Sequence, residues 1–185
     1  MINQSRFLKE ALDKTLETQT QEVNKALSLF NSSLKSGGKI LACGNGGSAA
    51  QCQHFVAELV VRFKKERRAI PAISLTTDTS NITACANDYS FDNIFERQVE
   101  ALARPNDVLF CLSTSGSSKN IIKAAQKAKS LNVKVISLTG PKQNQLEEIS
   151  DIIIKAQADS TDRIQEVHLF LIHNFCEQIE NELTA

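Results

Sequence analysis

The glycine-rich loop after the first short apolar run is the first part of the sequence that could bind a ligand. It reads Cys43-Gly44-Asn45-Gly46-Gly47-Ser48-Ala49, and five of the seven glycines lie between residues 37 and 47. Glycines let the backbone turn tightly and bring N–H groups close to a ligand at the start of the next helix. We therefore predict a ligand-binding turn at this position.

The spacing Gly44-x-Gly46-x-x-Ala49 also matches a loose dinucleotide fingerprint. That fingerprint expects an acidic residue about 20 positions on, at the end of the second strand, to hold a ribose. Glu66 has this spacing but lies in a charged segment, whereas Asp78 follows the second strand and is 34 positions beyond Gly44. We therefore do not expect a nicotinamide cofactor.

A second loop, Ser113-Thr114-Ser115-Gly116-Ser117-Ser118, offers five hydroxyl groups between an apolar run and a helical segment. Hydroxyls and free N–H groups at a helix N-terminus bind a phosphate monoester without a cationic side chain. The alternative is a turn that only caps its helix. Because capping needs one hydroxyl, the five together favour an anion site.

His54 and Glu58 form an i, i+4 pair in the helical segment that starts at the glycine loop. At 3.6 residues per turn their side chains share one face, where they would hold a metal ion or transfer protons. An ordinary contact on a helix surface has the same spacing, so the pair by itself leaves both interpretations open.

The other two histidines, His168 and His173, follow Gln165 in the last helical segment. Gln165 and His168 share a helix face, whereas Gln165 and His173 lie about 12 Å apart along the helix axis. Spacing alone therefore favours His168 as the companion of Gln165. A histidine outside the site is by default a core or a solvated residue.

The elements that must position these residues follow from a change of pattern at residue 39. Short apolar runs without alternation, typical of parallel strands covered on both faces, alternate with amphipathic helical segments. The runs are 40–43, 72–75, 108–112, 133–138 and 152–154, and the helical segments are 47–63, 91–103, 118–130 and 143–149. This order predicts an α/β fold with a doubly wound, five-stranded parallel sheet, whose ligands bind at the carboxyl ends of the strands.

Helical segments flank this core at both ends of the chain. The first 36 residues have apolar positions at helical spacing, either in one long helix or in two helices with a break at 17–22, where no apolar residue lies. Thr161 is the expected N-cap of the last helix. We expect one domain over residues 1–185, with an N-terminal helical arm (about 1–36), an α/β core (about 37–160) and a C-terminal helix (about 161–183).

The composition limits the classes of protein to which the chain can belong. Its 185 residues include 21 basic and 21 acidic side chains, so it lacks the excess of positive charge that a nucleic-acid surface needs. No apolar run approaches the roughly 20 residues that span a bilayer, and the first residues lack the apolar stretch of a signal peptide. We therefore expect a cytoplasmic protein with no nucleic-acid or membrane partner.

The cysteines are odd in number and show no CxxC spacing. They are Cys43, Cys52, Cys85, Cys111 and Cys176. We expect reduced thiols rather than a disulfide framework or a thiolate zinc site.

A cluster of basic residues surrounds Glu66. It consists of Arg62, Lys64, Lys65, Arg67 and Arg68. We expect a solvated helix end, where cations suit the negative pole of the helix dipole, rather than a docking patch for a partner.

Four segments of the chain together resemble the phosphoheptose isomerases of the sugar isomerase (SIS) family. They are CGNGGSAAQCQHFVAEL, TACANDYSFDNIFERQVEAL, LSTSGSSKNIIKA and TDRIQEVHLFLIH, and the similarity runs from about residue 37 to the end. Motifs that recur together in order are more specific than one glycine loop. The resemblance implies the flavodoxin-like, three-layer SIS fold. One departure is the segment 138–143, where relatives often have a glycine-rich stretch.

The resemblance also implies an activity and a site. The activity is the conversion of sedoheptulose 7-phosphate to D-glycero-D-manno-heptose 7-phosphate, the first step toward the ADP-heptose of bacterial surface polysaccharide, in a cytoplasmic homotetramer with one zinc ion per subunit and active sites between subunits. Carried over by motif, the zinc ligands are His54, Glu58, Gln165 and His173, so the resemblance selects His173 where spacing favours His168. The substrate contacts are Asn45, Gly46, Gly47, Glu58, Asn87, Asp88 and Gln165, and the phosphate contacts are Ser113, Thr114, Ser115 and Ser118.

Isomerisation of this kind needs a base for the weakly acidic proton beside the carbonyl group and an electrophile for the enediolate oxygen. We expect Glu58 to move the proton between C1 and C2, His173 to transfer protons at the oxygens, and zinc to polarise those oxygens.

The main alternative is a SIS tetramer without catalytic activity that binds the bacterial replication initiator protein, and a third is a module that senses phosphosugars. Relatives of the initiator-binding type typically lack the carboxylate that matches Glu58. Because this chain keeps that carboxylate together with both histidines and Gln165, the isomerase is the favoured reading.

Overall fold

A sheet of five parallel strands, in the order β2-β1-β3-β4-β5, forms the centre of the structure. The computed structural model describes residues 2–184. The strands are β1 (Ile40–Gly44), β2 (Ala72–Ser74), β3 (Val108–Ser113), β4 (Lys134–Thr139) and β5 (Ile152–Lys155). The α-helices are α1 (Ile2–Lys35), α2 (Gly47–Val60), α3 (Thr79–Asp88), α4 (Ile94–Leu102), α5 (Lys119–Ser130) and α6 (Thr161–Thr184). The predicted doubly wound parallel sheet is confirmed, and its strand order is the flavodoxin-like one.

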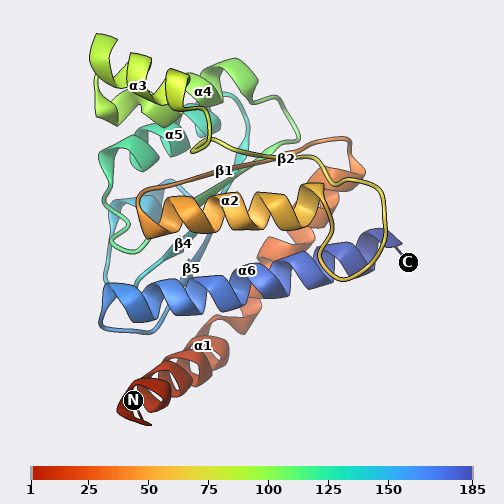
Figure 1. Cartoon of the computed structure of the whole chain (residues 1–185), viewed down its shortest axis with the longest axis vertical. Coiled ribbons are helices and arrows are strands. Elements are labelled where there is room, and N and C mark those ends of the chain that lie inside the picture. Colours follow the sequence, from red (N-terminus) through yellow and green to blue (C-terminus); the bar gives the residue numbers. More distant parts are fainter. Residues whose placement is uncertain (1, 185) are drawn as a thin grey trace.

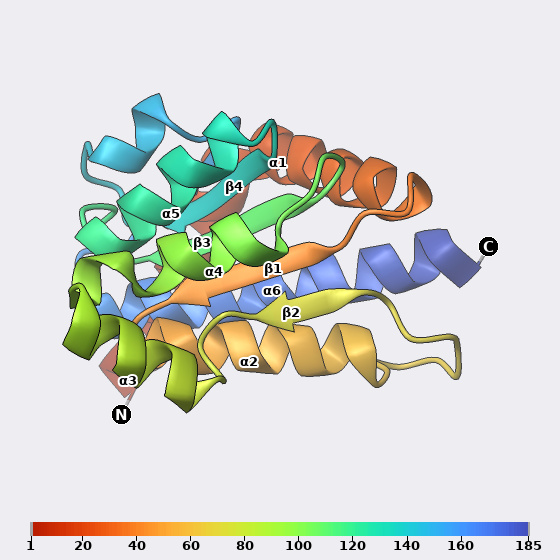
Figure 2. The same cartoon turned by 90° about the horizontal axis from the view of Figure 1, so that it is seen from above.

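Helices cover both faces of the sheet, with α3, α4 and α5 on one side and α2 and α6 on the other (Figure 1). Successive strand residues point to opposite faces. Ile40 and Ala42 therefore pack with α1, α2 and α6, while Leu41 and Cys43 pack with α3, α4 and α5. Figure 2 shows β2, β1, β3 and β4 side by side, with α3, α4 and α5 on the near side of the sheet. Burial on both faces explains why the strands read as continuous apolar runs.

Four phenylalanines hold α1, α2 and α6 against the sheet. Phe30, Phe55, Phe110 and Phe175 are fully buried, and in five of their six pairs the ring centroids lie 5.1 to 6.1 Å apart. Burial of each ring stabilises the fold by roughly 1.5–3 kcal/mol. The cluster fixes α2 and α6 side by side, and these two helices carry all three histidines.

Of the two arrangements that the sequence leaves open for the N-terminal arm, the structure has one unbroken helix. Two polar side chains of α1 satisfy backbone N–H groups of the edge strand β5 and of the segment after it. Gln19 Oε1 accepts a hydrogen bond from Lys155 N at 3.1 Å, and Thr15 Oγ1 accepts one from Gln157 N at 2.9 Å. The polar middle of α1 therefore covers a sheet edge, which explains why it needs no apolar residue.

Some expected boundaries differ from the structure. Helix α3 was not predicted; it begins after Asp78, whose carboxylate accepts the N–H of Asn81. The helix expected over 143–149 is only a 3₁₀ turn at Gln145–Glu148, held by a capping box. Thr161 is the first residue of α6 rather than its N-cap, because Ser160 supplies the first carbonyl of the helix.

The basic segment is not a solvated helix end. Helix α2 ends at Val60 instead of residue 63, and the chain then runs irregularly as far as β2. Within this segment the side chain of Arg67 is 3% exposed and pairs with Glu180, which is 1% exposed. That expectation was therefore wrong for Arg67, which is part of the interior.

All five cysteines are free and buried, as expected for reduced thiols. Among residues 2–184, no helix has both the length and the apolar character needed to cross a bilayer.

Candidate active site

A cavity of about 280 Å³ lies at the carboxyl ends of β1 and β3. These strands are neighbours in the sheet, but the chain leaves them toward opposite faces, so the cavity occupies the switch point where open α/β sheets bind ligands. The glycine loop and the serine loop both line it, as the sequence predicts. Its lining is Asn45, Gly46, Gly47, Ser48, Leu112, Ser113, Thr114, Ser115, Ser118, Ile121, Thr161 and Gln165.

Two positions of the first loop require glycine for structural reasons. Gly46 has φ 55°, a conformation that residues with a side chain rarely adopt. Gly47 lies so close to Gln165 that a β-carbon at this position would come within 2.7 Å of its amide atoms. Helix α2 begins here without a side-chain cap, so its N-terminus is open to an anion.

The serine loop leaves a second helix N-terminus open to the same cavity. Ser118 occupies the N-cap of α5, but its hydroxyl makes no capping hydrogen bond. Ser113, 3% exposed, accepts the N–H of Gly116 and stabilises the loop, and Thr114 O accepts the N–H of Gly140 at 3.0 Å. A loop that only capped its helix would use the Ser118 hydroxyl, so the geometry favours the anion site.

The two loops are joined by a pair of amides that sequence reasoning missed. Asn45 and Asn120 exchange two side-chain hydrogen bonds, each 2.9 Å long, and Asn120 is 2% exposed. Asn120 lies in the first turn of α5, and this proximity to the serine loop was the only available signal. The pair fixes the distance between the two helix N-termini.

His54, Glu58 and His173 come together on the surface between α2 and α6. His54 Nε2 lies 2.9 Å from His173 Nε2 and 3.5 Å from Glu58 Oε1. The side chain of His54 is 41% exposed and that of Glu58 23%, so the cluster is open to solvent. The ring of Phe63 stacks on His173 with centroids 5.8 Å apart.

His168 is not part of this cluster. It is fully buried, and its Nε2 lies 3.2 Å from the carbonyl oxygen of Thr139. Burial lowers the pKa of His168 to about 4, so that the imidazole is neutral near pH 7. The companion that spacing favours for Gln165 is therefore a core residue, and His173 is the histidine that joins the helix α2 pair.

The structure divides the remaining predicted residues between separate places. Gln165 lines the cavity rather than joining the histidines. Asn87 and Asp88 lie exposed at the end of α3, where Asp88 lines another cavity, of about 330 Å³. Within the described residues, no group of three or more His, Cys, Asp and Glu side chains is placed so that it could hold a metal ion.

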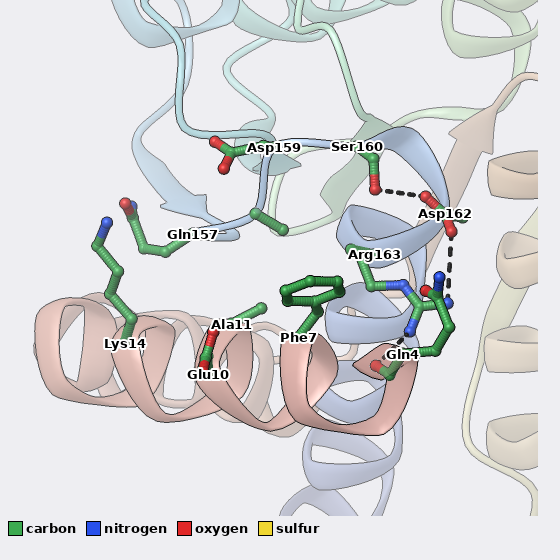
Figure 3. A pocket seen from close by; sticks show the side chains of 11 residues that line it. Gln4, Phe7, Glu10, Ala11, Lys14, Gln157, Asp159, Ser160, Asp162 and Arg163 are labelled. Atoms are coloured by element: carbon green, nitrogen blue, oxygen red, sulfur yellow. Dashed lines mark hydrogen bonds and ion pairs between the residues drawn. The ribbon is translucent and has the colours of Figure 1, made fainter. Parts of the chain in front are cut away.

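A larger cavity, of about 610 Å³, lies between the start of α1 and the start of α6 (Figure 3). Arg163 reaches across it to the carbonyl oxygen of Gln4 and forms an ion pair with Asp162. None of the predicted site residues lines this cavity, so size does not identify the site.

Comparison with known proteins agrees with this geometry. The model of the SIS domain family matches residues 5–140. A phosphoheptose isomerase of Helicobacter pylori is 50% identical over 172 residues, which are 93% of this chain and 90% of the relative. The solved structure of a phosphoheptose isomerase of Neisseria gonorrhoeae superimposes with a TM-score of 0.92 at 39% identity, and one of Francisella tularensis with 0.93 at 38% identity; each comparison covers 97% of this chain and 96% of the other. The chain therefore belongs to the SIS domain family and, within it, to the phosphoheptose isomerases, which are phosphosugar isomerases.

Proposed function

We propose that the chain converts sedoheptulose 7-phosphate to D-glycero-D-manno-heptose 7-phosphate through an enediolate. The observation that carries the proposal is the cluster in which His54 contacts both the Glu58 carboxylate and the His173 imidazole; Glu58 lies on the helix whose N-terminus opens into the cavity. An aldose–ketose isomerase needs a base, a proton carrier for the oxygens and a phosphate site, and these residues offer all three.

The phosphate binds at the serine loop. The hydroxyls of Ser113, Thr114, Ser115 and Ser118 and the open N-terminus of α5 are hydrogen-bond donors at the positive end of a helix dipole. Asn45, Gly46 and Gly47 then face the sugar from the loop at the start of α2. Asn87 and Asp88 belong to the proposed substrate contacts, although in the described chain they lie away from this cavity.

Glu58 removes the proton from one of the two carbons beside the reacting oxygens and returns it to the other. His173 moves protons at the oxygens. Its ring position is set by the stacked ring of Phe63 and by His54, 2.9 Å away. General acid–base catalysis of this kind contributes about 10²–10⁴-fold to a rate.

The donor types suit zinc, but the described chain does not place His54, Glu58 and His173 as a metal site, so zinc would have to draw these side chains together. Imidazole nitrogens and carboxylate oxygens are ligands that zinc accepts. His54 Nε2 lies 2.9 Å from His173 Nε2 and 3.5 Å from Glu58 Oε1, and these three side chains are the ones that would hold the ion. Gln165 is the proposed fourth ligand. Bound zinc would polarise the substrate oxygens.

Two observations support active sites between subunits, whereas the number of subunits, four, follows from the resemblance to the phosphoheptose isomerases. Glu58 follows Gly47 by 11 residues in α2, or about 16 Å along the axis, whereas six carbon–carbon bonds of about 1.5 Å reach about 9 Å. The cluster around Glu58 is also open to solvent, which leaves room for the loops of a second copy. We place the enzyme in the cytoplasm, at the first step toward the ADP-heptose of bacterial surface polysaccharide.

The test is turnover of sedoheptulose 7-phosphate by purified protein before and after chelation. We expect aldose product that disappears with chelation and returns with zinc. Glu58→Gln should keep the fold and lower kcat by about 10²-fold or more, whereas Glu148→Gln, on an exposed turn, should behave as wild type. No product in the presence of zinc would overturn the proposal and favour a SIS tetramer that binds the replication initiator.

A further inference from the structure

The segment after α2 is held by a single carboxylate from α6. Three successive backbone N–H groups, those of Phe63, Lys64 and Lys65, donate hydrogen bonds to Glu180 at 3.1, 2.9 and 2.9 Å. Glu180 is 1% exposed, so these bonds are shielded from water. A carboxylate in this position sets the path of the chain between α2 and β2.

Arg67 joins this carboxylate to the end of α2. Its Nε donates to Glu180 Oε1 at 3.1 Å, and its Nη2 donates to the carbonyl oxygen of Glu58 at 2.7 Å. Its Nη1 donates to the carbonyl oxygens of Leu59 and Arg68. The guanidinium therefore caps carbonyl groups in the last turn of α2, including that of Glu58 itself.

The same segment reaches the second histidine of the cluster. Phe63, whose N–H binds Glu180, stacks its ring on His173 at 5.8 Å with 27° between the planes. Glu180 lies seven residues beyond His173 on α6, about 10 Å along its axis. One carboxylate thus fixes the backbone of α2 at Glu58 and the ring that supports His173.

The ionisation of Glu180 is consistent with its contacts to three backbone N–H groups and Arg67. Burial by itself would raise the pKa of Glu180, but the three N–H groups and Arg67 outweigh it, and the pKa lies below the ordinary value. Glu180 is therefore an anion paired with the Arg67 cation at neutral pH.

We propose that Arg67 and Glu180 are positioning residues for the isomerisation, because they set the separation of the Glu58 carboxylate from the His173 imidazole. This inference rests on the proposed function. The two residues act through backbone groups, Arg67 on the Glu58 carbonyl and Glu180 on the Phe63 N–H, rather than through the Glu58 carboxylate or the His173 ring.

A second buried carboxylate provides a matched control. Asp107, 3% exposed, accepts hydrogen bonds from the backbone N–H groups of Lys39 and Arg104 and pairs with the Lys39 ammonium group. It holds a turn by the same kind of bonds, and these bonds go to no residue of the histidine cluster. Asp107→Asn therefore measures the cost of weakening such a network without disturbing Glu58 or His173.

The experiment compares Glu180→Gln, Arg67→Lys and Asp107→Asn with the wild type in kcat, KM and the pH profile of kcat. A misplacement of about 1 Å costs roughly 10²-fold in rate. We therefore expect Glu180→Gln to lower kcat at least about 10-fold, to change KM less than about threefold and to alter the pH profile, with a smaller loss in Arg67→Lys. Asp107→Asn should keep kcat within about twofold. Equal kcat in Glu180→Gln and Asp107→Asn would overturn the inference.

A second measurement does not depend on turnover. The chain has only three histidines, so their ring resonances can be assigned individually by NMR. Glu180→Gln should shift the His173 resonances, because the Phe63 ring moves, and leave those of buried His168 in place. If the wild type has no isomerase activity, the proposed function fails, and unchanged His173 resonances would overturn the positioning role as well. Should Glu180→Gln not fold, Phe63→Leu carries the same test, with a loss of kcat and a His173 shift expected.

Discussion

The amide of Gln165 occupies the space that a side chain on residue 47 would need. A β-carbon on Gly47 would lie 2.7 Å from both Nε2 and Oε1 of Gln165, closer than any ordinary contact. The relationship links the start of α2 to α6 at the edge of the cavity. A substitution at Gly47 would therefore move the side chain of Gln165 without replacing that residue.

Gly47→Ala should displace the Gln165 amide while the fold is retained, since the obstructing atoms are the tip of a flexible side chain. We expect kcat/KM to fall at least about 10-fold, by loss of a contact made in the transition state. In a Gln165→Ala background the same change should add little, because coupled residues are not additive. An equal loss in both backgrounds would show that Gly47 acts on something other than Gln165.

Ser118→Ala and Ser113→Ala should differ in kind. The Ser118 hydroxyl makes no capping bond, so its removal should raise KM for the phosphosugar several-fold and leave the melting temperature nearly unchanged. Ser113 is buried and accepts the N–H of Gly116, so its loss should also reduce the free energy of unfolding by about 1 kcal/mol. Steady-state kinetics and thermal unfolding of both variants check this. A large stability loss in Ser118→Ala would speak against the anion site.

Thr15→Val should destabilise the chain without altering the cavity. Thr15 is 1% exposed, and its hydroxyl receives the N–H of Gln157, which the substitution would leave without a partner. The expected cost is about 1–3 kcal/mol in urea unfolding. Thr18→Val, on the exposed side of the same helix, is the control and should change the stability by less than about 0.5 kcal/mol.

His168 should make the stability of the fold sensitive to acid. Its pKa is about 4 in the folded chain against an ordinary value of 6.5, so between these two pH values the unfolded state takes up a proton that the folded state does not. The free energy of unfolding should therefore fall between pH 6.5 and about 4, by roughly 3 kcal/mol in total, with no contribution above pH 7. In His168→Gln this part of the pH dependence should disappear. Parallel stability curves for the two proteins would contradict the assignment.

The parallel sheet could be predicted from the sequence, because strands that are buried on both faces are continuous apolar runs. The sequence was also sufficient for the two loops, whose composition has a local cause. Helix α3 could not be predicted from the sequence, because the segment TSNITACAND consists largely of weak helix formers. Only the Asp78 cap marks its start.

The choice between His168 and His173 shows what spacing leaves out. Helical periodicity says which residues share a face but not which face meets the core. Ile164, Leu171 and Phe175 are the buried neighbours of His168, and the apolar spacing of these residues could have identified its face. The contacts of Asn120, Arg67 and Glu180 join segments distant in the chain and have no local signal.

The five buried thiols can report local unfolding of the structure, because they become reactive only when they are exposed. All five are at most 9% exposed. The hydrogen bond with Cys111 and then burial raise the pKa of Cys43, and burial raises the pKa of Cys52 and Cys176. Cys43 and Cys111 face α4 and α5, while Cys52 and Cys176 belong to α2 and α6. A thiol reagent therefore reacts only after one layer separates from the sheet, and the order in which the cysteines are labelled would reveal which side of the molecule opens first.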